Sequence, residues 1–120
     1  MSLKAHTVQN GKIAIFDLKG SLIGDEETDA LRSTVADFLE QGNKYLVINL
    51  HKVNYLNSSG IGAIISAHAS YTKNGGTVRL ACLTNNIQNL LAVTRLIDIF
   101  EVYDTVETAI ESFATVKTHS

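Results

Sequence analysis

The sequence predicts an α/β domain whose small sheet is mostly parallel, with an antiparallel hairpin at the N-terminus. Short apolar runs alternate with longer segments of helical periodicity. Three such strand–helix–strand units favour parallel strands joined by right-handed crossovers. Near the N-terminus, Asn10-Gly11 lies between two extended stretches, which is a hairpin signal. The 120 residues match the size of a single domain, residues 1–120.

The predicted strands differ in how apolar they are. Residues 5–9 are polar and weakly extended, which is typical of an edge strand. Residues 12–19 carry apolar side chains on both faces and residues 45–50 are almost wholly apolar, so both are expected to be covered on two sides. Shorter strands are expected at residues 77–82 and 99–103.

Glycines and acidic residues delimit the first predicted helix. Residues 20–24 break the strand pattern and are expected to form a connection. The acidic segment 25–29 follows, and negative charge of this kind suits a helix N-terminus. Gly42 is expected to end the helix as the residue just after its C-cap.

The second predicted helix spans residues 58–73 and has two contrasting faces. Larger side chains mark the face expected to meet the core, namely Ile61, Ile64, Ile65 and His68. The other face is built of small residues, namely Gly62, Ala63, Ser66, Ala67 and Ser70. A face of this kind is smooth and uncharged, so a partner can approach it closely.

Two further helices complete the pattern. Ile87, Leu90 and Leu91 fall on one stripe of a third helix. Asp104 and Glu107 have capping-box spacing at the start of the last helix. Its expected inner stripe is Val106, Ala109, Ile110 and Phe113. Residues 115–120 are expected to be a frayed tail.

The composition excludes several classes of function. The formal net charge is −2 and the sequence shows no cluster of Lys or Arg, so nucleic-acid binding through a basic face is not expected. No apolar run approaches the ~18 residues that cross a bilayer, so no membrane partner is expected. Cys82 is the single cysteine, expected to be a buried and inert thiol in a reducing compartment. These features favour a cytoplasmic protein.

Residues 57–62, Asn-Ser-Ser-Gly-Ile-Gly, carry the strongest functional signal. They stand where backbone N–H groups at a helix N-terminus lack intrahelical partners, which favours an anion. Junctions rich in Ser, Asn and Gly are commonly structural. Here, however, Gly60 and Gly62 both fall in the first turn, and each costs the helix about 1 kcal/mol relative to Ala. A helix start with a purely structural role would not normally contain two such residues. A phosphate on a serine here would be tolerated by the fold, because it lies at a helix N-terminus, but it would prevent a partner from docking. Phosphorylation would therefore switch partner binding off.

No catalytic or cofactor motif accompanies this junction. Ser58 and Ser59 lack the G-x-S-x-G context of a hydrolase, and neither nucleotide-binding glycine motif is present. The four histidines have no spacing suited to a metal site or a catalytic triad. We therefore expect no enzyme activity, no metal and no cofactor.

The central residues resemble the signature of the STAS domain, and more narrowly that of bacterial anti-sigma factor antagonists. The resemblance rests on the apolar strand Val47–Leu50, the spacer His51–Leu56 and then residues 57–62. Asn74-Gly75-Gly76, residues 96–100 and Ala109 support it. It implies a STAS-like fold in which about four helices pack mainly on one face of a small sheet.

The resemblance also implies a function in transcription regulation by partner switching. The unphosphorylated protein would bind a serine-kinase anti-sigma factor and release its sigma factor. The kinase, which holds ATP and magnesium, would phosphorylate Ser58, with Ser59 as the second choice. A metal-dependent serine phosphatase would restore binding. The partner-binding set would be Asn57, Ser58, Ser59, Gly60, Ile61, Gly62, Ala63 and Ser66.

Two positions depart from the family pattern. Asn57 stands where the motif normally begins with Asp, and Ile23 stands where the preceding loop normally has an acid, with Asp25 two residues later. Both positions would lie near the acceptor serine. Two alternatives therefore stay open: a STAS module for a small anionic ligand or nucleotide at this helix N-terminus, and a STAS partner protein that is not regulated by phosphorylation.

Overall fold

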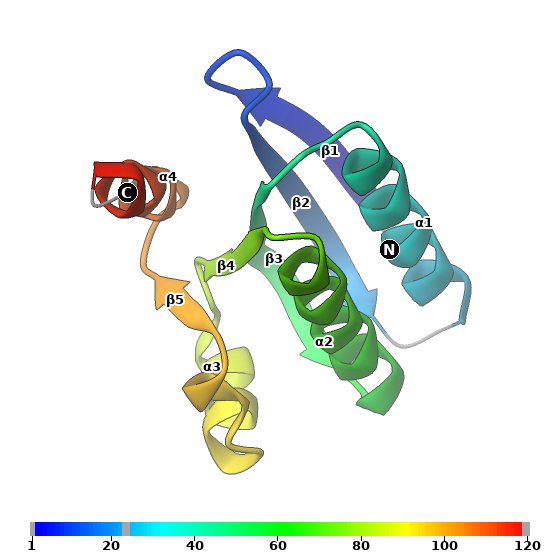
Figure 1. The fold of residues 1–120 in the computed structure, drawn as a ribbon. Helices are drawn as coiled ribbons and strands as arrows, with labels where there is room; N and C mark the ends of the chain where they lie inside the picture. Colours follow the sequence, from blue (N-terminus) through cyan, green and yellow to red (C-terminus); the bar gives the residue numbers. More distant parts are fainter. Residues whose placement is uncertain (1, 23–24, 119–120) are drawn as a thin grey trace.

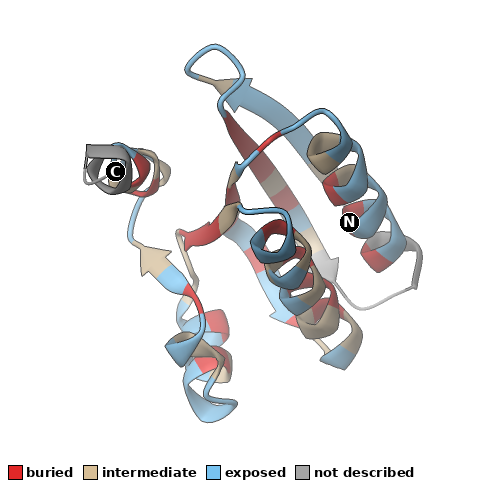
Figure 2. Cartoon of the chain, viewed as in Figure 1, coloured by how far each residue is buried: buried red, intermediate tan, exposed pale blue. Residues whose placement is uncertain are grey.

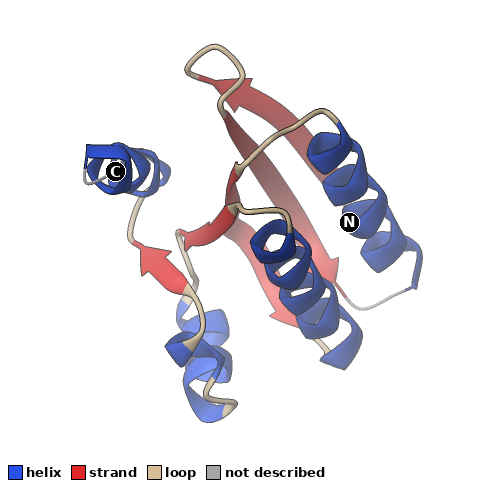
Figure 3. Ribbon diagram, viewed as in Figure 1, coloured by secondary structure: helices blue, strands red, loops and turns tan. Residues whose placement is uncertain are grey.

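A computed structural model of the chain describes residues 2–22 and 25–118. Within these ranges it forms a five-stranded sheet of order β1-β2-β3-β4-β5, with four α-helices and one short 3₁₀ helix (Figures 1 and 3). β1 is antiparallel to β2, and the other neighbouring strands are parallel, as predicted. The strands are β1 (Ser2–Val8), β2 (Ile13–Leu22), β3 (Tyr45–Leu56), β4 (Thr77–Ala81) and β5 (Glu101–Tyr103).

The N-terminal hairpin has a longer loop than a two-residue turn. Val8 pairs with Ile13, so four residues, 9–12, make the connection. Gln9, Asn10 and Gly11 all have positive φ values, of 53°, 59° and 82°. The residues that signalled the hairpin therefore do form its turn, because Asn and Gly accept the left-handed conformation most readily.

β2 and β3 extend well beyond the strands that the sequence predicts. Residues 20–22 and 51–56 were expected to be connections, but Ser21 pairs with Tyr55 and Leu22 pairs with Leu56. Register shifts occur between Asp17 and Lys19 and between Gly20 and Ser21, and they obscure the regular alternation of apolar and polar residues. One face of the extension is also exposed to solvent, so it lacks the continuous apolar run of a strand buried on both faces.

The helices cover the two faces of the sheet unequally (Figures 1 and 2). α1 (Asp25–Glu40), α2 (Ser58–Lys73) and α3 (Asn85–Val93) share the larger core cluster with one face. α4 (Val106–Thr118) packs on the other face, over Ile13, Ile15, Val47 and Ala81. This arrangement confirms the expectation of helices mainly on one side.

α2 has the predicted bounds but a different orientation. The buried residues are Gly60, Ala63, Ile64, Ala67 and Tyr71, whereas Ile65 is 37% exposed. The expectation that the small residues form the outer face is therefore wrong for Ala63 and Ala67, and the expectation that Ile65 meets the core is also wrong. Small side chains let a helix lie close to a sheet, and Ala63 and Ala67 pack on this inner face.

The C-terminal part differs from the prediction in three details. The reciprocal cap of α4 joins Thr105 and Thr108, with backbone N–H to Oγ1 distances of 3.3 and 3.0 Å, in place of Asp104 and Glu107. α4 continues to Thr118, so residues 115–118 are helical and not a tail, and residues 119–120 lie outside the described residues. A 3₁₀ helix (Leu96–Asp98) precedes β5 and leaves Ile99 exposed.

We expect Gly76→Ala to destabilise the fold, because Gly76 lies where two backbone segments meet. An added Cβ would lie 2.6 Å from the carbonyl oxygen of Lys44 and 3.0 Å from Tyr71 Cδ2. The free energy of unfolding, measured by urea denaturation, should fall by about 1–3 kcal/mol. Gly62→Ala is the control, since its Cβ would meet only the Arg32 side chain at 4.0 Å. Equal stability of the two variants would contradict this account.

Candidate functional site at the N-terminal end of α2

The junction between β3 and α2 is held by Asn57. This residue is the N-cap of α2, with an extended backbone conformation (φ −99°, ψ −172°). Its side-chain Oδ1 accepts a hydrogen bond from the N–H of Gly60 at 3.0 Å, and its carbonyl accepts one from Ile61 at 2.9 Å. Asn57 therefore has a structural role whatever else it does, because it satisfies one of the orphan donors of the helix.

Ser58 and Ser59 occupy the first two positions of α2, but their exposure differs. Ser58 is exposed and Ser59 is half-buried. Their N–H groups precede the first intrahelical hydrogen bond, which Ile61 donates. The first turn holds no acidic residue. A negative charge on Ser58 would thus lie at the positive end of the helix dipole, with no carboxylate of the same turn beside it.

An apolar stripe continues from Ser58 along the outer side of α2. Ile61 and Ile65 follow Ser58 at i+3 and i+7, so the three side chains share one side of the helix. Ile61 is half-buried and Ile65 is 37% exposed. Ile65 therefore places exposed apolar surface on the same side of α2 as the candidate acceptor. Ile65 was absent from the predicted partner-binding set because its apolar character placed it in the core.

The structure revises the rest of that set. Gly60 is buried and Ala63 has no exposed surface, so neither offers area to a partner. Gly62 is half-buried. Ser66 lines a groove of about 460 Å³ between α2 and α1, together with Arg32 and other residues. The accessible surface at this helix end consists of Asn57, Ser58, Ser59, Ile61, Gly62, Ile65 and Ser66.

The loop predicted to approach the acceptor is placed only in part. Leu22 pairs with Leu56, so the end of β2 lies directly beside the residue that precedes Asn57. Ile23 lies outside the described residues. Asp25 is the first residue of α1. The described end of β2 therefore lies next to the site, and the positions of Ile23 and Asp25 beside Ser58 stay predictions.

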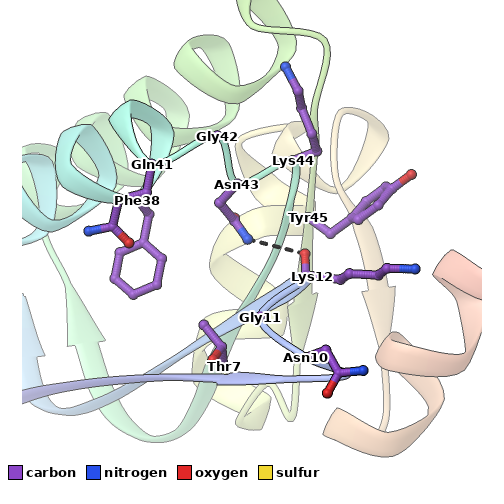
Figure 4. A pocket seen from close by; sticks show the side chains of 10 residues that line it. All are labelled: Thr7, Asn10, Gly11, Lys12, Phe38, Gln41, Gly42, Asn43, Lys44 and Tyr45. Carbon is purple, nitrogen blue, oxygen red and sulfur yellow. Dashed lines mark hydrogen bonds between the residues drawn. The ribbon is translucent and has the colours of Figure 1, made fainter.

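A separate hollow of about 520 Å³ lies at the other end of β3, around Tyr45 (Figure 4). Its two lysines do not converge. Lys44 Nζ donates to the carbonyl of Asn74 at 2.5 Å, and Figure 4 shows Lys12 extending in a different direction. Asn43 is occupied as well, because its Nδ2 donates to the Lys12 carbonyl at 3.1 Å and its Oδ1 accepts from Tyr71 at 2.7 Å. These hydrogen bonds join the backbone segments around the hollow.

Within the described residues, neither the Cys82 thiol nor the possible metal ligands are placed as a reactive site would require. Burial raises the pKa of the half-buried Cys82 thiol, and Glu107, Asp17 and Asp104 add to the effect, whereas a backbone hydrogen bond from Val106 opposes it. A thiol with a raised pKa is a poor nucleophile.

In residues 2–22 and 25–118, no three His, Cys, Asp or Glu side chains gather as metal ligands would. Over the same residues no helix has the length and apolarity to span a bilayer.

The fold is that of a small α/β domain in which an exposed serine, Ser58, begins α2. The model of the STAS domain family matches residues 4–109, and the chain belongs to this family. It is 28% identical over 75 residues to a Thermotoga maritima protein named as an anti-sigma factor antagonist. That match covers 62% of this chain and 66% of the relative. Anti-sigma factor antagonists are regulatory binding proteins and not enzymes.

Solved structures show the same fold. The crystal structure of TM1081 from Thermotoga maritima superposes with a TM-score of 0.81 at 22% identity, and the match covers 92% of both chains. The phosphorylated form of the Bacillus cell fate determinant SpoIIAA superposes with a TM-score of 0.75 at 17% identity, covering 93% of this chain and 99% of that one.

We expect Asn57→Ala to lower the free energy of unfolding by about 0.5–2 kcal/mol, because the N–H of Gly60 loses its side-chain acceptor. Asn57→Asp is the control. Aspartate caps as well as asparagine, so this variant should stay within a few tenths of a kcal/mol of the parent. Urea denaturation measures both. A loss of equal size in the two variants would show that the side-chain cap is not the cause.

Proposed function

We propose that this protein is an anti-sigma factor antagonist that binds a serine-kinase anti-sigma factor and releases its sigma factor. Phosphorylation of Ser58 ends the binding, and a metal-dependent serine phosphatase restores it. ATP and magnesium belong to the kinase, and the exchange takes place in the cytoplasm. One observation carries the proposal, namely the exposed position of Ser58 at the first residue of α2, on the same side of the helix as the half-buried Ile61 and the exposed Ile65.

Exposure favours Ser58 over Ser59 as the acceptor. A kinase must bring the γ-phosphate of ATP in line with the serine Oγ, which requires access from solvent. Ser58 is exposed, whereas Ser59 is half-buried. The two serines are adjacent, so phosphate on Ser59 is the natural second outcome.

A phosphate on Ser58 would change the surface far more than the fold. It adds a charge of about −1.5 to −2 at a helix N-terminus, which the helix dipole stabilises. Asn57 is neutral, so its cap bond to Gly60 survives the new charge. A partner covering Ile61 and Ile65 would have to remove the phosphate from water, and burying an unpaired charge is strongly unfavourable. Binding is therefore lost while the domain stays folded.

Phosphate mapping tests the switch directly. After incubation with the partner kinase, ATP and magnesium, mass spectrometry should place one phosphate on Ser58 and none on Ser58→Ala.

Ser58→Asp should lose binding to the kinase with nearly unchanged melting temperature, because a carboxylate suits the first turn of a helix. Ser58→Ala should keep binding. Absence of phosphate from both Ser58 and Ser59 would refute the switch, and a large fall in melting temperature would instead point to a structural role.

Ile65→Ser tests the apolar stripe. Its side chain is already 37% exposed, so the melting temperature should change little. Affinity for the kinase, measured by isothermal titration calorimetry, should fall about tenfold, which is the loss of one moderately important contact residue. Val93→Ser is the control, because Val93 is 82% exposed on α3. Equal losses in the two variants would show that α2 does not supply the contact.

A further inference from the structure

α4 leaves part of its face of the sheet uncovered. Its core cluster includes Ile15 of β2 and Val47 of β3, and the next residues on the same face are Asp17 and Asn49. Beyond α4 lies a hollow of about 430 Å³ formed by β1, β2 and β3. We call this surface the basic hollow; its main lining residues are Lys4, Asp17, Lys19, Asn49, His51 and Lys52.

The charge of the basic hollow is opposite to that of the whole chain. It holds three lysines and one carboxylate, whereas the chain has a formal net charge of −2. Lys19 and Lys52 are register partners on neighbouring strands. Like charges placed opposite one another destabilise a sheet, so this pair costs the fold some stability. Such a cost is expected where the two charges serve an anionic partner.

Hydrogen bonds hold the single acid of the hollow in place. Asp17 Oδ2 accepts from His6 Nε2 at 3.1 Å, and Oδ1 accepts from Asn49 Nδ2 at 2.8 Å. Asn49 Oδ1 in turn accepts from the backbone N–H of His51 at 3.1 Å. Within the described residues no ion pair joins the three lysines to an acidic side chain. The network therefore links three strands and holds the carboxylate of the hollow through partners other than these lysines.

We propose that the basic hollow docks an acidic segment of a partner protein. The lysines and His51 are all exposed, so a small ligand would remain largely in water, whereas pockets for small ligands bury most of their occupant. A protein segment lying across β1–β3 can cover them and exclude water. Nucleic-acid-binding domains are strongly basic, and this chain has a sequence pI of about 6.0.

This docking surface is independent of the switch. α2 and Ser58 belong to the face that carries α1 and α3, and the basic hollow lies on the opposite face. In this proposal Ser58 exchanges its phosphate on one face while the acidic partner stays bound on the other. The protein would then have one partner contact at Ser58 that phosphorylation regulates and a second contact at the basic hollow that phosphorylation does not affect.

An oligoglutamate peptide of ten residues is the probe. Titrated into the isotopically labelled full chain at low salt, it should shift the amide signals of Lys4, Lys19, Asn49, His51 and Lys52 and leave those of Ser58 and Ser59 unchanged. Lys52→Glu should weaken binding at least fivefold. This variant should also fold, because the new carboxylate would face Lys19. Lys73→Glu makes the same change of charge on α2 and should keep the parent affinity.

Three results would overturn the proposal. Equal weakening by Lys52→Glu and Lys73→Glu would mean that only the net charge matters. Shifts centred on Ser58 and Ser59 would move the anion site to the helix N-terminus. Tighter binding of pyrophosphate or of a thymidine oligonucleotide than of the peptide, at the same residues, would assign a different occupant. Retention of peptide binding by Ser58→Asp would support the independence of the two surfaces.

Discussion

The pairing of β2 with β3 is the interaction on which the rest of the molecule depends. It runs from Ile13 and Tyr45 at one end to Leu22 and Leu56 at the other. At the far end, the C-terminal end of β2 lies beside Leu56, which precedes the N-cap Asn57 of α2. Along the way, the register shifts bring Lys19 beside Lys52. The helix end with its exposed serine and the basic hollow are thus both consequences of one long, irregular strand pair.

The packing of α2 decides how the helix presents its serine. Gly60, Ala63 and Ala67 face the sheet and allow the helix to lie close to it, so the bulkier Ile61 and Ile65 remain at the surface in line with Ser58. Asn57 supplies the cap without adding charge. The helix end is therefore stable before any modification and carries no carboxylate of its own that a phosphate would meet. A charge added there changes what can bind and leaves the core intact.

Sequence reasoning succeeded where short-range chemistry decides the outcome. The bounds of α2, the turn at Asn10-Gly11, the positive φ of Gly42 at 88° and the inner stripe of α4 all follow from local residue preferences. It failed where tertiary contacts decide. The extension of β3 through Leu56 has one solvated face and an irregular register, so the sequence lacks the alternation of a regular strand there. Its pairing with β2 is what identifies it as a strand. Ile65 was assigned to the core because its side chain is apolar, although small residues occupy that face.

By itself the sequence determined the α/β class, the order of its elements and the junction of Asn57 with Ser58, since capping, turn formation and periodicity act over a few residues. Tertiary structure alone decided which side of α2 meets the sheet, because that choice depends on how closely the helix can approach. It also brought Lys4, Lys19 and Lys52, far apart along the chain, onto one surface. Their charges are scattered in the sequence, and only strand pairing makes them neighbours.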